Sequence, residues 1–375
     1  MPLEEIQAPR RVLGDTETKD RRVRSFLTAE GLDALVLGRQ DNFAWVTTGG
    51  NSHVITTSIM GVAYAVMTQD QKWLVSHAMD GQRLIEEQVP GQGYESITLF
   101  WHEGEPQRQV LELTKGMKVG ADFGLPGAAR YDREIVDLHY PLTDLEIARY
   151  RWIGAKVNEI FGRVACELEP GVTEREVAAR LLYEYALSGM TIDVLIVGFD
   201  DRVGRYRHPM PGDSILQSYA LLHAAARRWG LHVNVTRLVH FGEPPTEIAR
   251  AIDAAATVGA GVVALMAPGV SFADMLTEQK RLYAQLGYRD EWNYHFQGGI
   301  TGYVLADPMR CLDPDARLVR RQAYDYFITI TGAKYEECVL LTDDGPETVS
   351  LDAGWPTRNL ETAHGAVEVA DVLIR

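Results

Sequence analysis

The chain has 375 residues, of which 46% are hydrophobic and 24% are charged. This composition predicts a soluble globular protein with enough apolar residues for two domains. Its 37 Lys and Arg residues against 52 Asp and Glu residues give a formal net charge of −15. That balance argues against nucleic acid or an anionic membrane as the main partner, because both require clustered positive charge.

Three cysteines are scattered through the chain without a closely spaced pair: Cys166, Cys311 and Cys338. An odd, sparse set predicts a reducing compartment and no disulfide framework. The N-terminal residues lack a basic region followed by an apolar run, so we expect no signal peptide. No stretch approaches 18 uninterrupted apolar residues, so we also expect no membrane span. These features together predict a cytoplasmic protein.

The first 141 residues alternate between helical and strand patterns, which predicts a small α/β domain. Helices are expected at residues 21–30, 78–88 and 106–115. Strands are expected at residues 34–37, 42–48, 61–68, 72–76, 94–101 and 117–123.

A second domain, residues 142–375, is expected after the segment Pro141-Leu-Thr-Asp-Leu-Glu146. Thr143 with Glu146 and Thr173 with Glu176 have the spacing of a capping box, which satisfies free amides in the first helical turn. Helices are therefore expected at 144–168, 173–188, 246–266 and 271–286. Strands are expected at 191–197, 218–224 and 231–239, and through most of the remaining sequence.

Three segments of the C-terminal half occur in a characteristic order. They are Tyr206-Arg-His-Pro209, Leu221-Leu-His-Ala224 followed by His232-Val-Asn-Val-Thr-Arg237, and Thr331-Gly-Ala-Lys-Tyr-Glu-Glu337. They resemble the active-site strands of the aminopeptidase P, prolidase, methionine aminopeptidase and creatinase family. The resemblance is specific over about residues 145–350. It implies an α+β chain, with a creatinase-like α/β domain at residues 1–141 and a pita-bread domain at residues 142–375.

The chain departs from the ligand set that this resemblance implies. Metal-dependent members of the family hold two divalent ions with two aspartates, a histidine and two glutamates. Here the aspartate positions read His223 and Asn234, and the histidine reads Gln297 or is displaced to His295. The first glutamate position falls near residues 305–307, where there is no Glu, and only Glu336 is retained.

Loss of both aspartates removes the anionic ligands that would neutralise a pair of cations, so we expect no bound metal. The alternative is a rebuilt site, because His223, His295, Asp307 and Glu336 offer nitrogen and oxygen ligands. The paired glycines at 298–299 open no helix, and there is no Walker loop, HExxH or nucleophile-elbow serine. We therefore expect no cofactor.

Two residues are the strongest candidates for catalysis. His208 corresponds to the histidine that lies near the substrate in both metal-dependent and metal-free members, and imidazole titrates near neutral pH. Glu336 is expected either to orient a cationic substrate nitrogen, as in creatinase, or to pair internally with Arg237 or Lys334, because an unpaired buried charge is costly.

Further residues could line a polar substrate pocket. Arg207 or Arg237 could hold a substrate carboxylate through two parallel hydrogen bonds. The complete set of substrate-binding candidates is Arg207, His223, His232, Asn234, Arg237, His295, Gln297 and Tyr303.

The expected function is that of a metal-independent, creatinase-like enzyme. It would act on a small, polar, nitrogen-containing metabolite by C–N hydrolysis or an acid/base rearrangement. Three alternatives stay open: a metal-dependent Xaa-Pro aminopeptidase or prolidase with substituted ligands, a non-hydrolytic cyclase or isomerase, and an inactive binding module like the histone-chaperone members of this fold. The resemblance also implies a homodimer.

Overall fold

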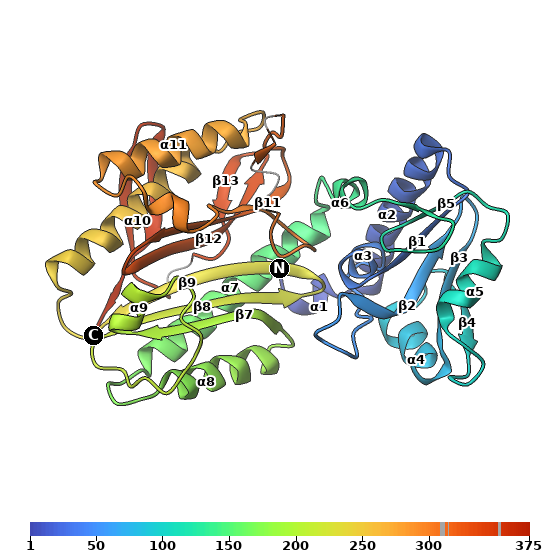
Figure 1. Cartoon of the computed structure of the whole chain (residues 1–375), viewed down its shortest axis with the longest axis horizontal. Coiled ribbons are helices and arrows are strands. Elements are labelled where there is room, and N and C mark those ends of the chain that lie inside the picture. The colour runs from blue at the N-terminus through green and yellow to red at the C-terminus, as the bar shows by residue number, and fades with distance from the viewer. Residues whose placement is uncertain (308–311, 314, 352–353) are drawn as a thin grey trace. The chain divides into compact units, whose positions relative to one another are not determined.

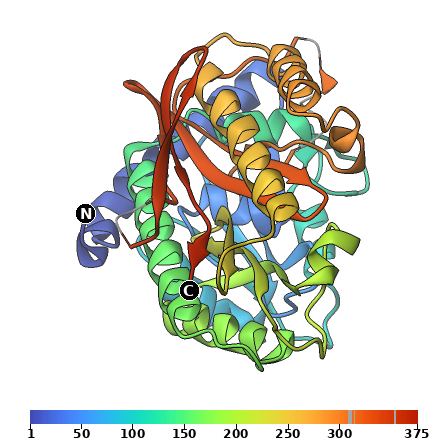
Figure 2. The ribbon, with the colours of Figure 1, turned by 90° about the vertical axis from the view of Figure 1, so that its left-hand side faces the viewer.

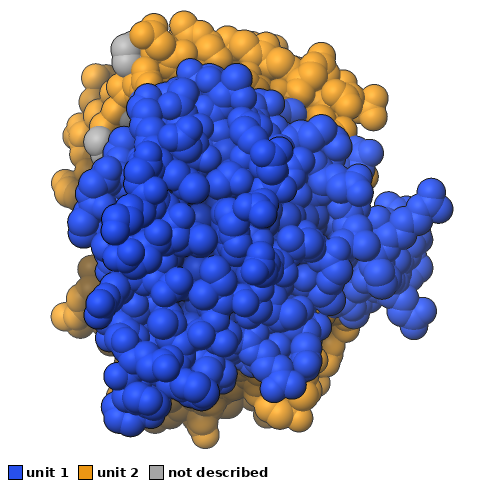
Figure 3. All heavy atoms as spheres, turned by 90° about the vertical axis from the view of Figure 1, so that its right-hand side faces the viewer, with its two compact units in different colours: residues 1–145, 229–231 blue, residues 146–228, 232–375 orange. Residues whose placement is uncertain are grey.

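The computed structural model describes residues 1–307, 312–313, 315–351 and 354–375. Cys311 lies outside the described residues. The chain forms two compact units (Figure 3). Unit 1 contains residues 1–145 and 229–231, and unit 2 contains residues 146–228 and 232–375.

Unit 1 is built on a mixed six-stranded sheet with the strand order β4-β3-β2-β1-β5-β6 (Figure 1). The strands are β1 (Ala34–Arg39), β2 (Met60–Met67), β3 (Lys72–His77), β4 (Glu95–Leu99), β5 (Val119–Ala121) and β6 (Ala129–Arg130). Buried β-branched residues on β1, β2, β3 and β5, including Val36, Val66 and Val75, form the core of this sheet. Such side chains suit a pleated, buried surface.

The helices of unit 1 are α1 (Leu3–Ile6), α2 (Pro9–Glu30), α3 (Gln40–Val46), α4 (Ala78–Arg83), the π-helical η1 (Leu84–Gln88), α5 (Pro106–Leu113) and α6 (Arg133–Leu138). The strand predicted at residues 42–48 is wrong, because most of this segment lies in α3. Phe43, Trp45 and Val46 are all fully buried. When a short segment is buried on every side, its apolar residues show no periodicity that would distinguish a helix from a strand.

Unit 2 contains two four-stranded sheets, β16-β9-β8-β7 and β10-β11-β12-β13. The strands of the first sheet are β7 (Thr191–Phe199), β8 (Tyr219–Arg228), β9 (Leu231–His240) and β16 (Leu373–Ile374). Those of the second are β10 (Gly299–Thr301), β11 (Gln322–Ile330), β12 (Ala333–Thr342) and β13 (Gly345–Thr348). A separate hairpin pairs β14 (Thr357–Thr362) with β15 (Gly365–Ala370), beside α10 (Figure 2).

Helices cover the outer faces of the sheets in unit 2 (Figure 1). They are α7 (Asp144–Cys166), α8 (Glu174–Leu187), α9 (Asp201–Arg205), α10 (Thr246–Leu265), α11 (Phe272–Gln285) and the 3₁₀ helix η2 (Glu291–Tyr294). The capping box predicted at the start of α8 is confirmed, with Thr173 and Glu176 each bonding the other's backbone amide. α8 packs on β7, while α10 packs on β11 and β12.

Among the described residues one helix, α10, is long and apolar enough to cross a membrane by length and composition alone. Of its apolar window, 61% is buried inside the protein. The helix packs closely on the sheet, since a Cβ added at Gly259 would lie 2.2 Å from the Tyr335 ring. A buried core helix can have the same length and hydropathy as a membrane-spanning helix. The hydropathy of α10 is therefore weak evidence for a membrane span.

Candidate functional site

The site lies on the face of β11 and β12 that points away from α10. Side chains alternate between the two faces of a strand, and Tyr335 contacts α10. Its neighbours Lys334 and Glu336 therefore face the other way. In the antiparallel register Thr329 lies opposite Lys334 and Phe327 opposite Glu336. Asp325, two residues before Phe327, shares their face.

Glu336 is the centre of a buried polar cluster. Its Oε2 accepts a hydrogen bond from Thr236 Oγ1 at 2.7 Å and lies 2.9 Å from His223 Nδ1. The ammonium nitrogen of Lys334 lies 2.5 Å from the same oxygen. The side chains of Lys334, His223 and Glu336 are 4%, 4% and 1% exposed. Of the two internal partners expected from the sequence, Glu336 therefore pairs with Lys334 and not with Arg237.

The Lys334–Glu336 pair carries the charge of this cluster. Burial would raise the pKa of Glu336, but the neighbouring His223 and Lys334 together hold it below its ordinary value. Burial lowers the pKa of His223 in spite of the nearby carboxylate. We therefore assign a neutral His223 that donates Nδ1–H to an ionised Glu336, with Lys334 as the compensating cation.

Asn234 and Asp325 form the second part of the cluster. Asn234, on β9, donates its Nδ2–H to Oδ2 of Asp325, on β11. Burial, followed by the negative charge of Glu336, raises the pKa of Asp325 well above its ordinary value. The sequence placed the first acidic ligand position near residues 305–307. The carboxylate that the structure brings beside Asn234 is Asp325, because β11 and not the preceding segment lies opposite β9 here.

The accessible edge of the site is formed by two histidines. His208 is exposed, and its ring lies 5.0 Å from that of His295 in an edge-to-face arrangement. His295 also packs against Phe296 and Phe327. Partial burial and then the positive charge of Lys334 lower the pKa of His208 below its ordinary value. The same two causes, in the same order, lower the pKa of His295 to about 3.

Two of the predicted pocket residues, Arg207 and Gln297, bond other residues near the edge of the site. Arg207 pairs with Glu291 and contacts Thr331 Oγ1 at 3.2 Å. Gln297 donates from Nε2 to the carbonyl of His295 at 2.6 Å and accepts from Tyr283 Oη at 3.1 Å. These bonds order the polypeptide on either side of His208 and His295. Neither side chain contacts Glu336 or Asn234.

Three more predicted residues lie outside the Glu336 cluster. Arg237 is fully buried against Glu337 at 2.7 Å and also bonds Ser350 O at 2.7 Å. His232 lies 2.9 Å from Asp193 Oδ2 and 2.9 Å from Gly302 O. Tyr303 donates its hydroxyl to Glu146 Oε1 at 2.7 Å. The structure thus brings together His208, His223, Asn234, His295 and Glu336.

Sequence reasoning missed three contributors to the cluster: Thr236, Asp325 and, as a member of the site, Lys334. A period-2 signal could have found two of them. Thr236 follows Asn234 by two positions on β9, and Lys334 precedes Glu336 by two positions on β12, so each shares a face with a predicted residue. Asp325 had no such signal, because only the pairing of β11 with β12 places it.

The cluster does not fit the two-ion centre of the metal-dependent members. Across the ranges that the structure describes, no group of three or more His, Cys, Asp or Glu side chains is arranged to hold a metal ion. Glu336 Oε2 already contacts three donor groups of the protein, and one of them is the Lys334 cation. An ammonium group at 2.5 Å from a ligand oxygen competes directly with a divalent ion for that oxygen.

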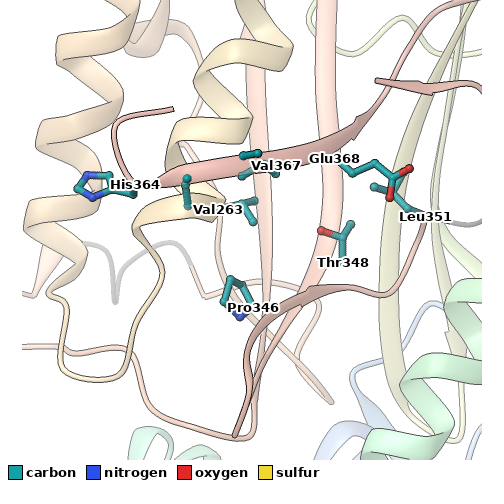
Figure 4. Close-up of a pocket in the computed structure, with 10 residues that line it drawn as sticks. Val263, Pro346, Thr348, Leu351, His364, Val367 and Glu368 are labelled. Atoms are coloured by element: carbon teal, nitrogen blue, oxygen red, sulfur yellow. The ribbon is translucent and has the colours of Figure 1, made fainter. Parts of the chain in front are cut away.

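A separate pocket of about 430 Å³ lies on the α10 side of unit 2 (Figure 4). It is lined by Val263, Ala264, Pro346, Thr348, Leu351, His364, Gly365, Ala366, Val367 and Glu368. None of these residues belongs to the Glu336 cluster.

Comparisons with known proteins agree with this architecture. Residues 148–318 match metallopeptidase family M24. A probable dipeptidase PepE of Mycobacterium tuberculosis is 24% identical over 215 residues, which cover 55% of this chain and 57% of that protein. The crystal structure of dipeptidase PepE from Mycobacterium ulcerans has a TM-score of 0.76 at 18% identity, and covers 97% of this chain and 99% of that one. A Xaa-Pro dipeptidase from Bacillus anthracis has a TM-score of 0.75 at 17% identity, with coverages of 96% and 100%.

The chain has the pita-bread fold of these solved structures, and residues 148–318 carry the sequence match to metallopeptidase family M24. The α+β fold class expected from the sequence is confirmed, because the chain shares its fold with these solved structures over nearly its whole length. The sequence match spans little more than half the length of the mycobacterial dipeptidase.

Proposed function

We propose that this protein is an M24-fold enzyme that acts without a divalent metal ion on a small, polar, nitrogen-containing metabolite. The observation that carries the proposal is the Lys334–Glu336 ion pair. The one acidic ligand position retained from the metal-dependent pattern already has a protein cation on its Oε2, at 2.5 Å. A buried carboxylate whose charge is compensated in this way does not need a metal ion for its stability.

Charge neutrality of the whole cluster supports the same proposal. Lys334 balances Glu336, while Asn234 is a neutral amide and burial favours the neutral forms of His223 and Asp325. A pair of divalent ions would add four positive charges to a buried site that contains two carboxylates, one of them paired. Such an excess of charge is costly in a low-dielectric interior.

In this proposal His208 is the general acid/base group of the reaction. Its lowered pKa keeps the imidazole mainly neutral at pH 7, so it can accept a proton from water or from the substrate. Its exposed position next to His295 gives it access to solvent. The reaction class is C–N hydrolysis or an acid/base rearrangement, because general acid/base catalysis serves both.

A second candidate is a metal-dependent Xaa-Pro dipeptidase. It is favoured by the relatives, since the mycobacterial protein carries the name of a probable dipeptidase and the Bacillus anthracis structure that of a Xaa-Pro dipeptidase. A ring-forming or isomerising enzyme and a binding module without catalysis stay compatible with the same fold. We further propose a cytoplasmic homodimer with no nucleic-acid or membrane partner.

The experiment that separates the two leading candidates measures metal content and turnover on one preparation. Protein purified without chelator is analysed for zinc, manganese, iron and cobalt. It is then assayed on Xaa-Pro dipeptides and on small amides and ureido acids, before and after chelation. We expect less than about 0.1 metal ion per chain, and turnover of a non-peptide substrate that chelation leaves unchanged. One or more ions per chain with chelator-sensitive dipeptide cleavage would establish the second candidate instead.

A further inference from the structure

Lys334 is an unusual lysine, because its ammonium group is buried. Lysine is rarely found fully buried unless it is paired, and this residue is 5% exposed. Its Nζ lies 2.5 Å from Glu336 Oε2 and 5.8 Å from the centre of the Phe327 ring. Glu336 is in turn fixed by Thr236 and His223. The cation is thus held by a buried carboxylate that is itself bonded on two sides, and its positive charge acts on the nearby His208 and His295.

The ammonium group has donor capacity that the protein does not use. It carries three protons, and within the part of the chain that the structure describes its one acceptor is Glu336 Oε2. Two protons are therefore available for an acceptor that is not part of the cluster. A carbonyl or carboxylate oxygen is the strongest common acceptor for an ammonium group.

Three unsatisfied polar atoms lie on β9 and β11. Asn234 Oδ1, Asp325 Oδ1 and Thr329 Oγ1 are buried and, within the described ranges, have no hydrogen-bond partner. Thr329 lies directly opposite Lys334 in the strand register. Buried polar atoms in native proteins are nearly always satisfied by protein groups or by water, so these three atoms are open to a polar occupant. Asn234 Oδ1 requires an N–H or O–H donor, while Lys334 requires an acceptor.

We propose that the Lys334 ammonium group binds the carbonyl or carboxylate oxygen of the substrate, while Asn234 Oδ1 receives a substrate N–H group. The inference rests on the proposed metal-free function and deepens it by defining the substrate class. The substrate carries an acceptor oxygen and an N–H within a few bonds of each other, as in an N-acyl amino acid or a small amide. Lys334 is then a catalytic residue, since it touches the substrate, and Glu336 is the positioning residue that holds it.

This assignment reverses the role that the sequence suggested for Glu336. The negative charge of Glu336 is already compensated within the protein, because its Oε2 contacts Lys334, His223 and Thr236 and the side chain is 1% exposed. The site therefore offers the substrate oxygen a positive charge.

The test measures the affinity of a defined probe by titration calorimetry at pH 7.5. N-acetylglycine carries a carboxylate, a carbonyl and an amide N–H, while n-butylamine carries a cation and no acceptor oxygen. We expect saturable binding of N-acetylglycine to the parent protein. Lys334→Met should weaken it by at least about tenfold, because a charge-assisted hydrogen bond is lost, and Lys334→Arg should restore part of the affinity. Lys156→Met is the matched control, because Lys156 also pairs with a glutamate, Glu159, but on the surface of α7.

A folding defect is separated from a binding defect by a second variant. Lys334→Met leaves the Glu336 carboxylate buried without its cation, which can destabilise the fold. Lys334→Met combined with Glu336→Gln removes both charges, and its circular dichroism shows whether it is folded. If this folded double variant binds N-acetylglycine as tightly as the parent, Lys334 has no role in binding and the inference is wrong. Absence of saturable binding to the parent, or stronger binding of n-butylamine than of N-acetylglycine, overturns it equally.

Metal content measured on the same samples distinguishes this failure from failure of the proposed function. Equal probe affinity in metal-free parent and variant overturns the role of Lys334 alone. Stoichiometric metal in the parent, with chelator-sensitive turnover, overturns the metal-free function and this inference with it.

Discussion

Lys334 and Glu336 stand two positions apart on β12, and the ammonium nitrogen of the first lies 2.5 Å from a carboxylate oxygen of the second. Residues at i and i+2 of a strand share a face, so this pair is set by the strand itself. His223 and Thr236 reach the same oxygen from β8 and β9. The contacts of His223 and Thr236 with Glu336 therefore join the two four-stranded sheets of unit 2.

Restoring both aspartates is not expected to restore peptidase activity. In His223→Asp with Asn234→Asp, the ammonium group of Lys334 still occupies Glu336, and metal catalysis needs a fixed geometry and an activated water as well as affinity. The two new carboxylates would also lie beside Glu336 and Asp325. We expect no cleavage of Xaa-Pro dipeptides and a loss of about 3 kcal/mol in unfolding free energy. The matched control is His364→Asp with Asn359→Asp, two exposed positions of the β14–β15 hairpin. Clear dipeptide cleavage by the first variant would contradict the prediction.

His208→Ala should lower kcat/KM by a factor of about a hundred to ten thousand, which is the usual loss for one general acid/base group. The thermal midpoint should stay close to that of the parent, because the side chain is exposed.

The lowered pKa of His208 also sets the sign of the pH dependence of the rate. A general base is inactive once it is protonated. The kcat/KM of the parent should therefore be constant from pH 8 to about 6.5 and fall only at lower pH. His364→Ala, in an exposed turn, is the control. A rate that rises as the pH falls below 6.5 would assign His208 as an acid.

Arg237 is expected to act on stability and not on substrate binding. Its guanidinium is fully buried and pairs with Glu337 at 2.7 Å. Arg237→Met leaves that carboxylate buried without a counter-charge, so unfolding in urea should show a loss of about 3–5 kcal/mol. Adding Glu337→Gln should recover part of it. The affinity for N-acetylglycine should not change in the folded variants. Normal stability together with lost probe binding would instead favour the substrate-carboxylate role predicted from the sequence.

His139 should make unit 1 sensitive to acid. Burial lowers the pKa of its imidazole to about 3, and its Nε2 lies 2.9 Å from Asn42 Oδ1. Above pH 6.5 the ring is neutral in both the folded and the unfolded state. As the pH falls from 6.5 toward 3, the unfolded chain takes up a proton that the folded chain excludes, so stability is lost over that window. His139→Gln should flatten the decline in unfolding free energy between pH 7 and pH 4.5, measured in urea. The exposed His102→Gln serves as the control, and an equal slope in both variants would refute the assignment.

The sequence by itself determined the framework of this protein. Helix and strand periods located most elements of both units, and Thr173 with Glu176 marked the start of α8. The motifs around His208, His223, Asn234 and Glu336 indicated the fold family, because their order and spacing can be read directly along the chain. They also revealed that aspartate ligands are replaced. The segment at residues 42–48 was missed, since burial on all sides of α3 removes the period that distinguishes helix from strand.

Only the tertiary structure decided which polar groups meet. Asp325 reaches Asn234 from 91 residues further along the chain, and Arg237 reaches Glu337 across 100 residues. Such partners depend on strand register and sheet closure, which no short-range pattern encodes. Arg237 pairs with Glu337 through this long-range geometry, whereas the pairing of Lys334 with Glu336 follows from β12 alone, although either base could have neutralised Glu336 on sequence grounds. The face of each strand decided between them, because Lys334 shares a face with Glu336 whereas Arg237 points from β9 to the opposite side.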